Sequence, residues 1–131
     1  MRNLLVSILV LFAVPVFAVP VEAGTVAGLW LTGPDQKGQV GHILLAPCGA
    51  NLCGTVVTAI DKAGRSVKTP NVGKQVIWDV KEVGADRFAG QMHVSHFNAT
   101  VKGQFLVSGH KMTVRGCLGP VCQSQVWTRL K

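Results

Sequence analysis

Four cysteines carry the clearest chemical potential in this chain of 131 residues. Cys48 and Cys53 enclose four residues, and Cys117 and Cys122 enclose four others. Such pairs could ligate zinc, or the four thiols could form disulfides in any of three connectivities. Because a hairpin with a four-residue loop brings its flanking Cβ atoms to about 4.5–5.5 Å, we expect disulfides within each pair. A cross-link between the two hairpins would close a longer loop and stabilise more, and it stays open as the alternative.

Residue types that serve in catalysis are present, but their spacing assembles no recognisable site. The carboxylates after residue 23 are Asp35, Asp61, Asp79, Glu82 and Asp86. None of them forms a pair that strand alternation would place in one interior. His93 and His96 are three residues apart, so in a strand they point to opposite faces and could share an ion only across a turn. No serine lies in a nucleophile elbow, and we expect no enzyme, no cofactor and no metal site.

Residues 1–23 have the layout of a secretory leader. A basic start precedes an apolar run over Leu4–Val14, and the small residues that follow predict cleavage after Ala18 or Ala23. The run is shorter than the roughly 20 residues that span a bilayer, and no nearby cysteine could carry a lipid. We therefore expect residues 24–131 to be exported to the periplasm or secreted, without a membrane span. An oxidising compartment favours disulfides over zinc.

The chain is basic, with 13 Lys and Arg against 6 Asp and Glu and a formal net charge of +7. This balance favours anionic partners in the cell envelope, such as lipid head groups or acidic polysaccharide. The basic residues of the exported part are, however, scattered singly from Lys37 to Lys131, which is typical of a solvated surface. We expect no nucleic-acid partner, because no basic run with interleaved aromatic residues occurs.

Short segments rich in β-branched and aromatic residues recur through residues 24–131, separated by Gly, Pro, Asn and Asp. They predict one all-β domain with eight strands and no long helix. The expected strands are Ala27–Thr32, Gln39–Ala46, Cys53–Ile60, Lys74–Glu82, Asp86–Val94, Ala99–Val107, His110–Gly116 and Cys122–Leu130. Tight turns such as Ser108–Gly109 make neighbouring strands antiparallel, which predicts a meander. The linker Asp61–Gly73 lacks apolar alternation and is either functional or flexible.

Alternation within these strands predicts which side chains share a face, because successive side chains of a strand point to opposite sides. Three strands show one apolar and one polar face. The apolar faces are formed by Val76, Trp78 and Val80, by Phe88, Met92 and Val94, and by Met112 and Val114. By the same rule His42 falls in phase with Val40 and Leu44 and is expected to be semi-buried.

The first and last strands carry Gly28-Leu29-Trp30 and Trp127-Thr128-Arg129. Closing an up-and-down meander pairs these strands, and a guanidinium stacked on an indole is a favourable contact. The pattern resembles the barrel-closing Gly-x-Trp and C-terminal Arg of the lipocalin and avidin-like superfamily, the calycins. The resemblance assigns barrel closure to Gly28, Trp30 and Arg129.

A second resemblance covers nearly the whole exported part. Four segments carry it: Gly28–Trp30, Cys48–Val57 (CGANLCGTVV), Gly73–Val80 (GKQVIWDV) and Val114–Arg129 (VRGCLGPVCQSQVWTR). They are similar to a family of small exported bacterial proteins classed as a domain of unknown function, which implies a lipocalin-like barrel in the cell envelope with no established activity. The chain departs from the family pattern after Asp61 and over Gln91–Thr100, where QMHVSHFNAT replaces an Asp-Pro-rich segment.

An eight-stranded barrel is either filled by side chains or open to one small ligand. The leading hypothesis is a non-catalytic envelope protein that binds a small apolar or amphipathic ligand, by analogy with the fold. Its candidate lining residues are Trp30, Trp78, Phe88, Met92 and Phe105, which could equally fill the core. The alternative is a periplasmic protein–protein interaction module or protease inhibitor that uses the cysteine-stapled tips and the Asp61–Gly73 linker, because preorganised loops lower the ordering cost of binding.

Overall fold

The computed structural model describes residues 10–15, 26–95 and 97–131. Within these ranges it contains nine β-strands and no helix. The strands are β1 (Gly28–Leu31), β2 (Val40–Cys48), β3 (Asn51–Ile60), β4 (Ser66–Val67), β5 (Gln75–Gly84), β6 (Arg87–Val94), β7 (Ala99–Ser108), β8 (Lys111–Leu118) and β9 (Val121–Arg129). All eight expected strands are present. No helix in the described part of the chain is long and apolar enough to cross a membrane.

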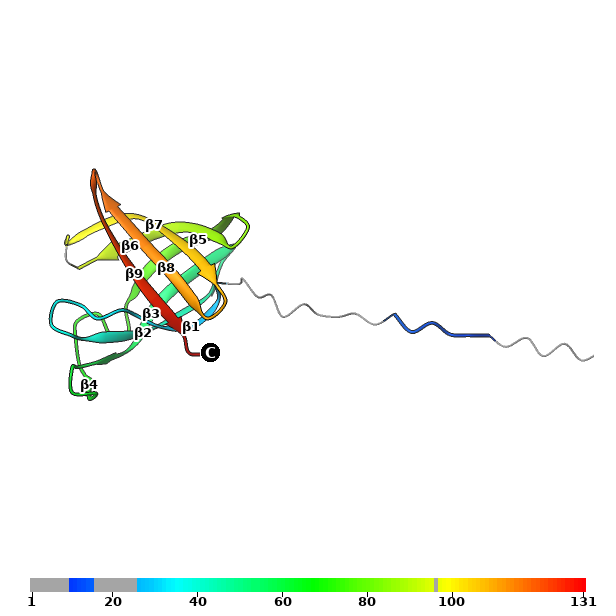
Figure 1. Cartoon of the computed structure of the whole chain (residues 1–131), viewed down its shortest axis with the longest axis horizontal. Coiled ribbons are helices and arrows are strands. Elements are labelled where there is room, and N and C mark those ends of the chain that lie inside the picture. Colours follow the sequence, from blue (N-terminus) through cyan, green and yellow to red (C-terminus); the bar gives the residue numbers. More distant parts are fainter. Residues whose placement is uncertain (1–9, 16–25, 96) are drawn as a thin grey trace, which may run out of the picture.

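Eight of the strands close into an antiparallel barrel (Figure 1). Neighbours pair in the order β1, β2, β3, β5, β6, β7, β8 and β9, and β9 returns to pair with β1. Five of the seven connections between consecutive barrel strands are turns of two to four residues, which leave the joined strands side by side; the β1–β2 and β3–β5 connections are longer. The predicted eight-stranded antiparallel barrel is therefore confirmed. The predicted leader and its cleavage after Ala18 or Ala23 lie largely outside the described residues.

Strand β4 is the ninth strand, and it folds the Asp61–Gly73 linker back onto β3. Ile60 pairs with Ser66, and Ala59 pairs with Val67. At the far end of the linker the Gly73 N–H donates to the Val56 carbonyl oxygen at 2.7 Å. The linker is thus hydrogen-bonded to β3 at both of its ends. A strand of two residues is too short to show an alternating pattern, so the sequence did not predict this arrangement.

The barrel interior is filled by apolar side chains. The most deeply buried are Trp30, Phe105, Leu45, Ile77, Met112, Val26 and Val80. Glycines on neighbouring strands make room for them: a Cβ at Gly54 would lie 2.9 Å from Ile77 Cβ, and one at Gly90 would lie 2.9 Å from Val80 Cγ2. Of the two states open to an eight-stranded barrel, the structure shows the filled one, because apolar side chains occupy the space that an internal ligand would need.

Strand β5 departs from the predicted alternation. Ile77 and Val80 are both fully buried although they are three residues apart, and Trp78 is only half-buried and lies outside the core cluster. The cause is a bulge, because the pairing with β6 shifts between Trp78 and Lys81 and Asp79 has a φ of 55°. The prediction that Trp78 shares an interior face with Val80 is wrong. The interior faces predicted for β6 and β8 agree with the structure: Met112 and Val114 are buried, and Phe88 and Met92 pack against the core.

This bulge predicts different costs for two neighbouring substitutions. Ile77→Ala removes a fully buried side chain and should lower the free energy of unfolding by about 2–5 kcal/mol. Trp78→Ala should cost clearly less despite the larger side chain, because Trp78 lies outside the core cluster. Urea unfolding followed by fluorescence under oxidising conditions would measure both. A larger loss of unfolding free energy for Trp78→Ala than for Ile77→Ala would contradict the shift in side-chain alternation at the β5 bulge.

Candidate functional site

The two ends of the barrel sheet meet at Trp30 and Arg129. These residues are paired across β1 and β9, and the Arg129 Cζ atom lies 4.3 Å from the centroid of the Trp30 ring. Arg129 Nη1 also donates to the Ala27 carbonyl oxygen at 2.7 Å, and the Trp30 indole N–H donates to the Val26 carbonyl oxygen at 2.9 Å. The guanidinium therefore stacks on the indole and ties down the segment that enters β1. The structure brings the predicted closure residues together.

Gly28 completes this closure because it leaves space for the end of the chain. Its φ is +134°, and a Cβ at this position would lie 2.5 Å from the Lys131 carbonyl oxygen and 2.8 Å from Arg129 Nη1. That carbonyl oxygen accepts a hydrogen bond from the Leu29 N–H at 2.9 Å. A side chain at position 28 would displace both the last residue and the stacked guanidinium.

Each cysteine pair forms a disulfide within its own hairpin, as the loop spacing predicted. Cys48 is bonded to Cys53, and Cys117 is bonded to Cys122. The two hairpins nevertheless differ. Cys117 lies directly opposite Cys122, with a Cα–Cα distance of 4.0 Å, whereas Cys48 lies opposite Asn51, so its disulfide crosses the hairpin diagonally at 5.7 Å.

The expectation of directly opposed cysteines is therefore wrong for the β2–β3 hairpin. The turn there consists of Gly49 and Ala50 alone, and Asn51 already belongs to β3. Both hairpins use a glycine at positive φ in the turn, Gly49 at 70° and Gly119 at 59°. These glycines permit tight turns, so both staples lie at hairpin tips.

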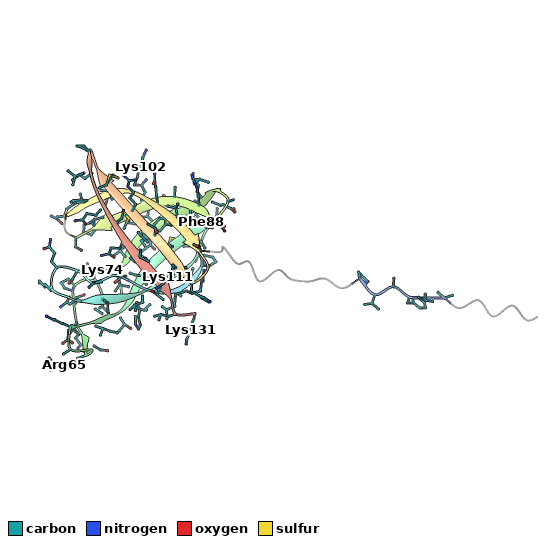
Figure 2. The ribbon with its side chains drawn as sticks, viewed as in Figure 1. Arg65, Lys74, Phe88, Lys102, Lys111 and Lys131 are labelled. Carbon is teal, nitrogen blue, oxygen red and sulfur yellow. A yellow bond between two sulfur atoms is a disulfide. The ribbon has the colours of Figure 1, made fainter. Side chains whose placement is uncertain are left out.

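An open hollow of about 320 Å³ lies beside the stapled β2–β3 turn. We call it the hairpin hollow. Its walls come from the end of β2, the start of β3, the second half of β5 and the start of β6; they are formed by Pro47, Gly49, Ala50, Asn51, Leu52, Val80, Lys81, Glu82 and Phe88. Phe88, near the start of β6, is labelled in Figure 2. The lining of the hollow therefore combines apolar side chains with one cationic and one anionic side chain.

Local irregularities of β5 shape this hollow. The pairing of β5 with β6 shifts on both sides of Lys81 and Glu82, and its pairing with β3 shifts between Leu52 and Gly54. Bulges of this kind re-aim side chains and interrupt pairing, which opens space between strands. Sequence reasoning missed Leu52, Lys81 and Glu82, because the β3–β5 contact joins strands that are separated by the linker.

The candidate lining residues do not form one cavity. Trp30 and Phe105 are fully buried in the core, and Met92 packs against it. Trp78 is half-buried outside the core cluster. Of the five candidates, Phe88 is the one that lines the hairpin hollow.

Two of the carboxylates, those of Asp35 and Asp61, accept backbone hydrogen bonds in turns. The Asp35 Oδ1 atom accepts two backbone N–H groups at 2.8 and 2.9 Å. Asp61 makes the same kind of turn and also forms an ion pair with Arg65 at 3.3 Å. Asp79 and Asp86 adopt positive φ values of 55° and 56°, a conformation that Asp and Asn tolerate better than most residues. Asp35 and Asp61 thus stabilise turns through their side chains, whereas Asp79 and Asp86 occupy positions of unusual backbone conformation.

The histidines are spread over the barrel. His42 and His93 are half-buried in different strands, and His110 is exposed in a turn. His96, the other member of the candidate pair, lies outside the described residues. In the part of the chain that the structure describes, no group of three or more His, Cys, Asp or Glu side chains could hold a metal ion.

One family model matches this chain. It is described as an uncharacterized protein conserved in bacteria (DUF2147), and it matches residues 28–129. The match runs from Gly28 to Arg129 and so contains both closing strands and all four cysteines. Comparisons with curated proteins and with solved structures gave no match.

The crowding at Gly28 predicts a position-specific loss of stability. Gly28→Ala should lower the free energy of unfolding by about 2–6 kcal/mol, because steric overlap adds to the strain of a positive φ. Gly64→Ala is the matched control: its φ is +83°, but nothing lies within 4 Å of an added Cβ. The control should lose only about 1–3 kcal/mol in the same urea titration. Equal losses would show that Lys131 and Arg129 do not crowd the position.

Each of the two disulfides should contribute modestly to the free energy of unfolding. Replacing both cysteines of one hairpin by alanine should lower the free energy of unfolding by about 2 kcal/mol, since each disulfide closes a short loop. The barrel should stay folded, because both disulfides lie at hairpin tips and neither belongs to the core. Far-ultraviolet circular dichroism and thermal unfolding of the two double variants would test this. Loss of the β-sheet signal in either variant would contradict a tip-only role.

Proposed function

The chain belongs to this bacterial family of uncharacterized proteins, and from that premise we propose that it is a non-catalytic exported envelope protein that binds a small amphipathic ligand. The two disulfides support an oxidising location outside the cytoplasm. The leader layout of residues 1–23 supports export. The engagement of the Asp35 and Asp61 carboxylates in turns supports a protein without an acid–base site.

The observation that carries the proposal is the hairpin hollow. Its volume of about 320 Å³ suits a small molecule, and Leu52, Val80 and Phe88 offer apolar contact. Lys81 and Glu82 are exposed lining residues and can orient a polar head group. The Cys48–Cys53 disulfide fixes the turn that forms one wall, which lowers the ordering cost of binding. The filled interior favours this outer position over a ligand inside the barrel.

A protein–protein interaction module or protease inhibitor is the second candidate, and one observation favours it. The β8–β9 hairpin is exposed on both faces over Val121–Val126, and the Cys117–Cys122 disulfide lies within it. A stapled, protruding hairpin presents a preorganised surface to a protein partner. This candidate requires no small molecule in the hollow.

Native mass spectrometry of the protein purified from the bacterial envelope without reductant would test the proposal. We expect a reproducible non-covalent adduct whose mass identifies the ligand. Phe88→Ser should remove the adduct, because Phe88 forms a wall of the hollow. Val57→Ser is the control, since Val57 is exposed on β3 and does not line the hollow.

Two outcomes would overturn the ligand proposal. One is an adduct that survives Phe88→Ser in a variant with unchanged circular dichroism. The other is a bare protein mass in every preparation, which would favour the interaction module. Inhibition assays against envelope proteases and pull-downs with the intact β8–β9 hairpin would then follow.

A further inference from the structure

The acidic residues of this protein all lie in the first two thirds of the chain. All six Asp and Glu residues precede Arg87, so the segment Arg87–Lys131 contains basic residues and no carboxylate side chain. This segment forms β6, β7, β8 and β9, which are consecutive neighbours in the barrel. One contiguous part of the sheet is therefore free of acidic side chains, although the basic residues are scattered singly along the sequence.

Three exposed cations lie on the outer side of β7 and β8. Lys102, Lys111 and Arg115 alternate with buried residues of the same strands, so they point away from the core. Lys102 and Lys111 mark opposite ends of this surface (Figure 2). None of the three forms an ion pair within the described residues; Lys111 Nζ donates to Thr128 Oγ1 at 3.1 Å. Their charges are available to a partner.

Two exposed apolar side chains lie between these cations. Leu106, Thr113 and Val126 form one row across β7, β8 and β9. Leu106 is 39% exposed, and Val126 is 56% exposed. The row lies between the level of Arg115 and the level of Lys111 in the register. We call Lys102, Leu106, Lys111, Arg115 and Val126 together the basic face.

We propose that the basic face docks on the surface of an anionic lipid bilayer. Anionic head groups complement the three cations, and each Lys or Arg near such a surface adds to the attraction. The exposed Leu106 and Val126 can enter the boundary between head groups and acyl chains. A soluble acidic polysaccharide would satisfy the cations but would give these apolar side chains no partner, so the row favours lipid.

The basic face is separate from the hairpin hollow. Its residues belong to β7, β8 and β9, whereas the hollow is formed by β2, β3, β5 and β6. The proposal therefore stands whether or not the hollow binds a ligand. Docking through the basic face would leave the hollow in place on other strands of the barrel.

Vesicle co-sedimentation of the full chain tests the proposal. The probes are vesicles of phosphatidylcholine alone and vesicles of phosphatidylcholine mixed with phosphatidylglycerol. We expect binding to the mixed vesicles that weakens as salt is raised, because exposed charges are screened. Each of Lys102→Gln, Lys111→Gln and Arg115→Gln should weaken binding about fivefold.

Matched controls separate this face from the charge of the whole protein. Lys62→Gln and Lys68→Gln remove cations of the linker that are also exposed, and they should leave binding unchanged. All variants share the same N-terminal segment, so differences between them report on the face alone. Equal losses in the linker variants would overturn the proposal.

The apolar row distinguishes lipid from polysaccharide. Leu106→Ser and Val126→Ser should weaken binding to the mixed vesicles but leave binding to dextran sulfate, a soluble polyanion, unchanged. If neither substitution affects vesicle binding and dextran sulfate binds as tightly as the vesicles, the face recognises polyanions and the lipid proposal is wrong. Failure to bind phosphatidylglycerol vesicles at low salt would also overturn it.

Discussion

The barrel depends on the short pairing of β1 with β9 that closes it, which we call the seam. Strand β1 has only four residues, and its register with β9 consists of Trp30 opposite Arg129 and Leu31 opposite Thr128. Two pairs of residues would be weak support for a closed sheet, so the stacked guanidinium and the hydrogen bonds between Leu29 and Lys131 reinforce the seam from both sides. Closure pairs β1 with β9, so neither strand is left as a free edge of the sheet. Closure also encloses the core that contains Trp30.

Because apolar side chains fill the interior, both proposed binding surfaces lie on the outside of the barrel. Gly54 and Gly90 leave room for Ile77 and Val80, which are both buried in the core. The outer surface of the barrel differs from strand to strand. Bulges in β5 open the hairpin hollow, whereas the regularly paired strands β7, β8 and β9, which carry no carboxylate side chain, form the basic face. The regular strands and the irregular ones thus carry different surfaces.

The sequence predicted the fold well and the candidate site poorly, for physical reasons. Alternation in β6 and β8 and the closure residues could be read directly, because each depends on local spacing or on the two ends of a meander. The bulge at Asp79 could not be predicted from the sequence. One extra residue in the strand exchanges the inward and outward faces for the residues that follow, and no residue type in this segment marks the position. The hairpin hollow depends on the irregular pairing of β3 with β5 across the linker, and only Phe88 among its walls was a candidate.

The position of the disulfides has a consequence for the order of events during folding. Each disulfide joins residues only five apart, whereas the seam joins Trp30 to Arg129 and must wait for the last strand. Contacts of low sequence separation form early, and those of high separation form late. The hairpins can therefore be oxidised in a chain that is still open. Formation of the two covalent bonds therefore does not require closure of the barrel, and the two events are separable.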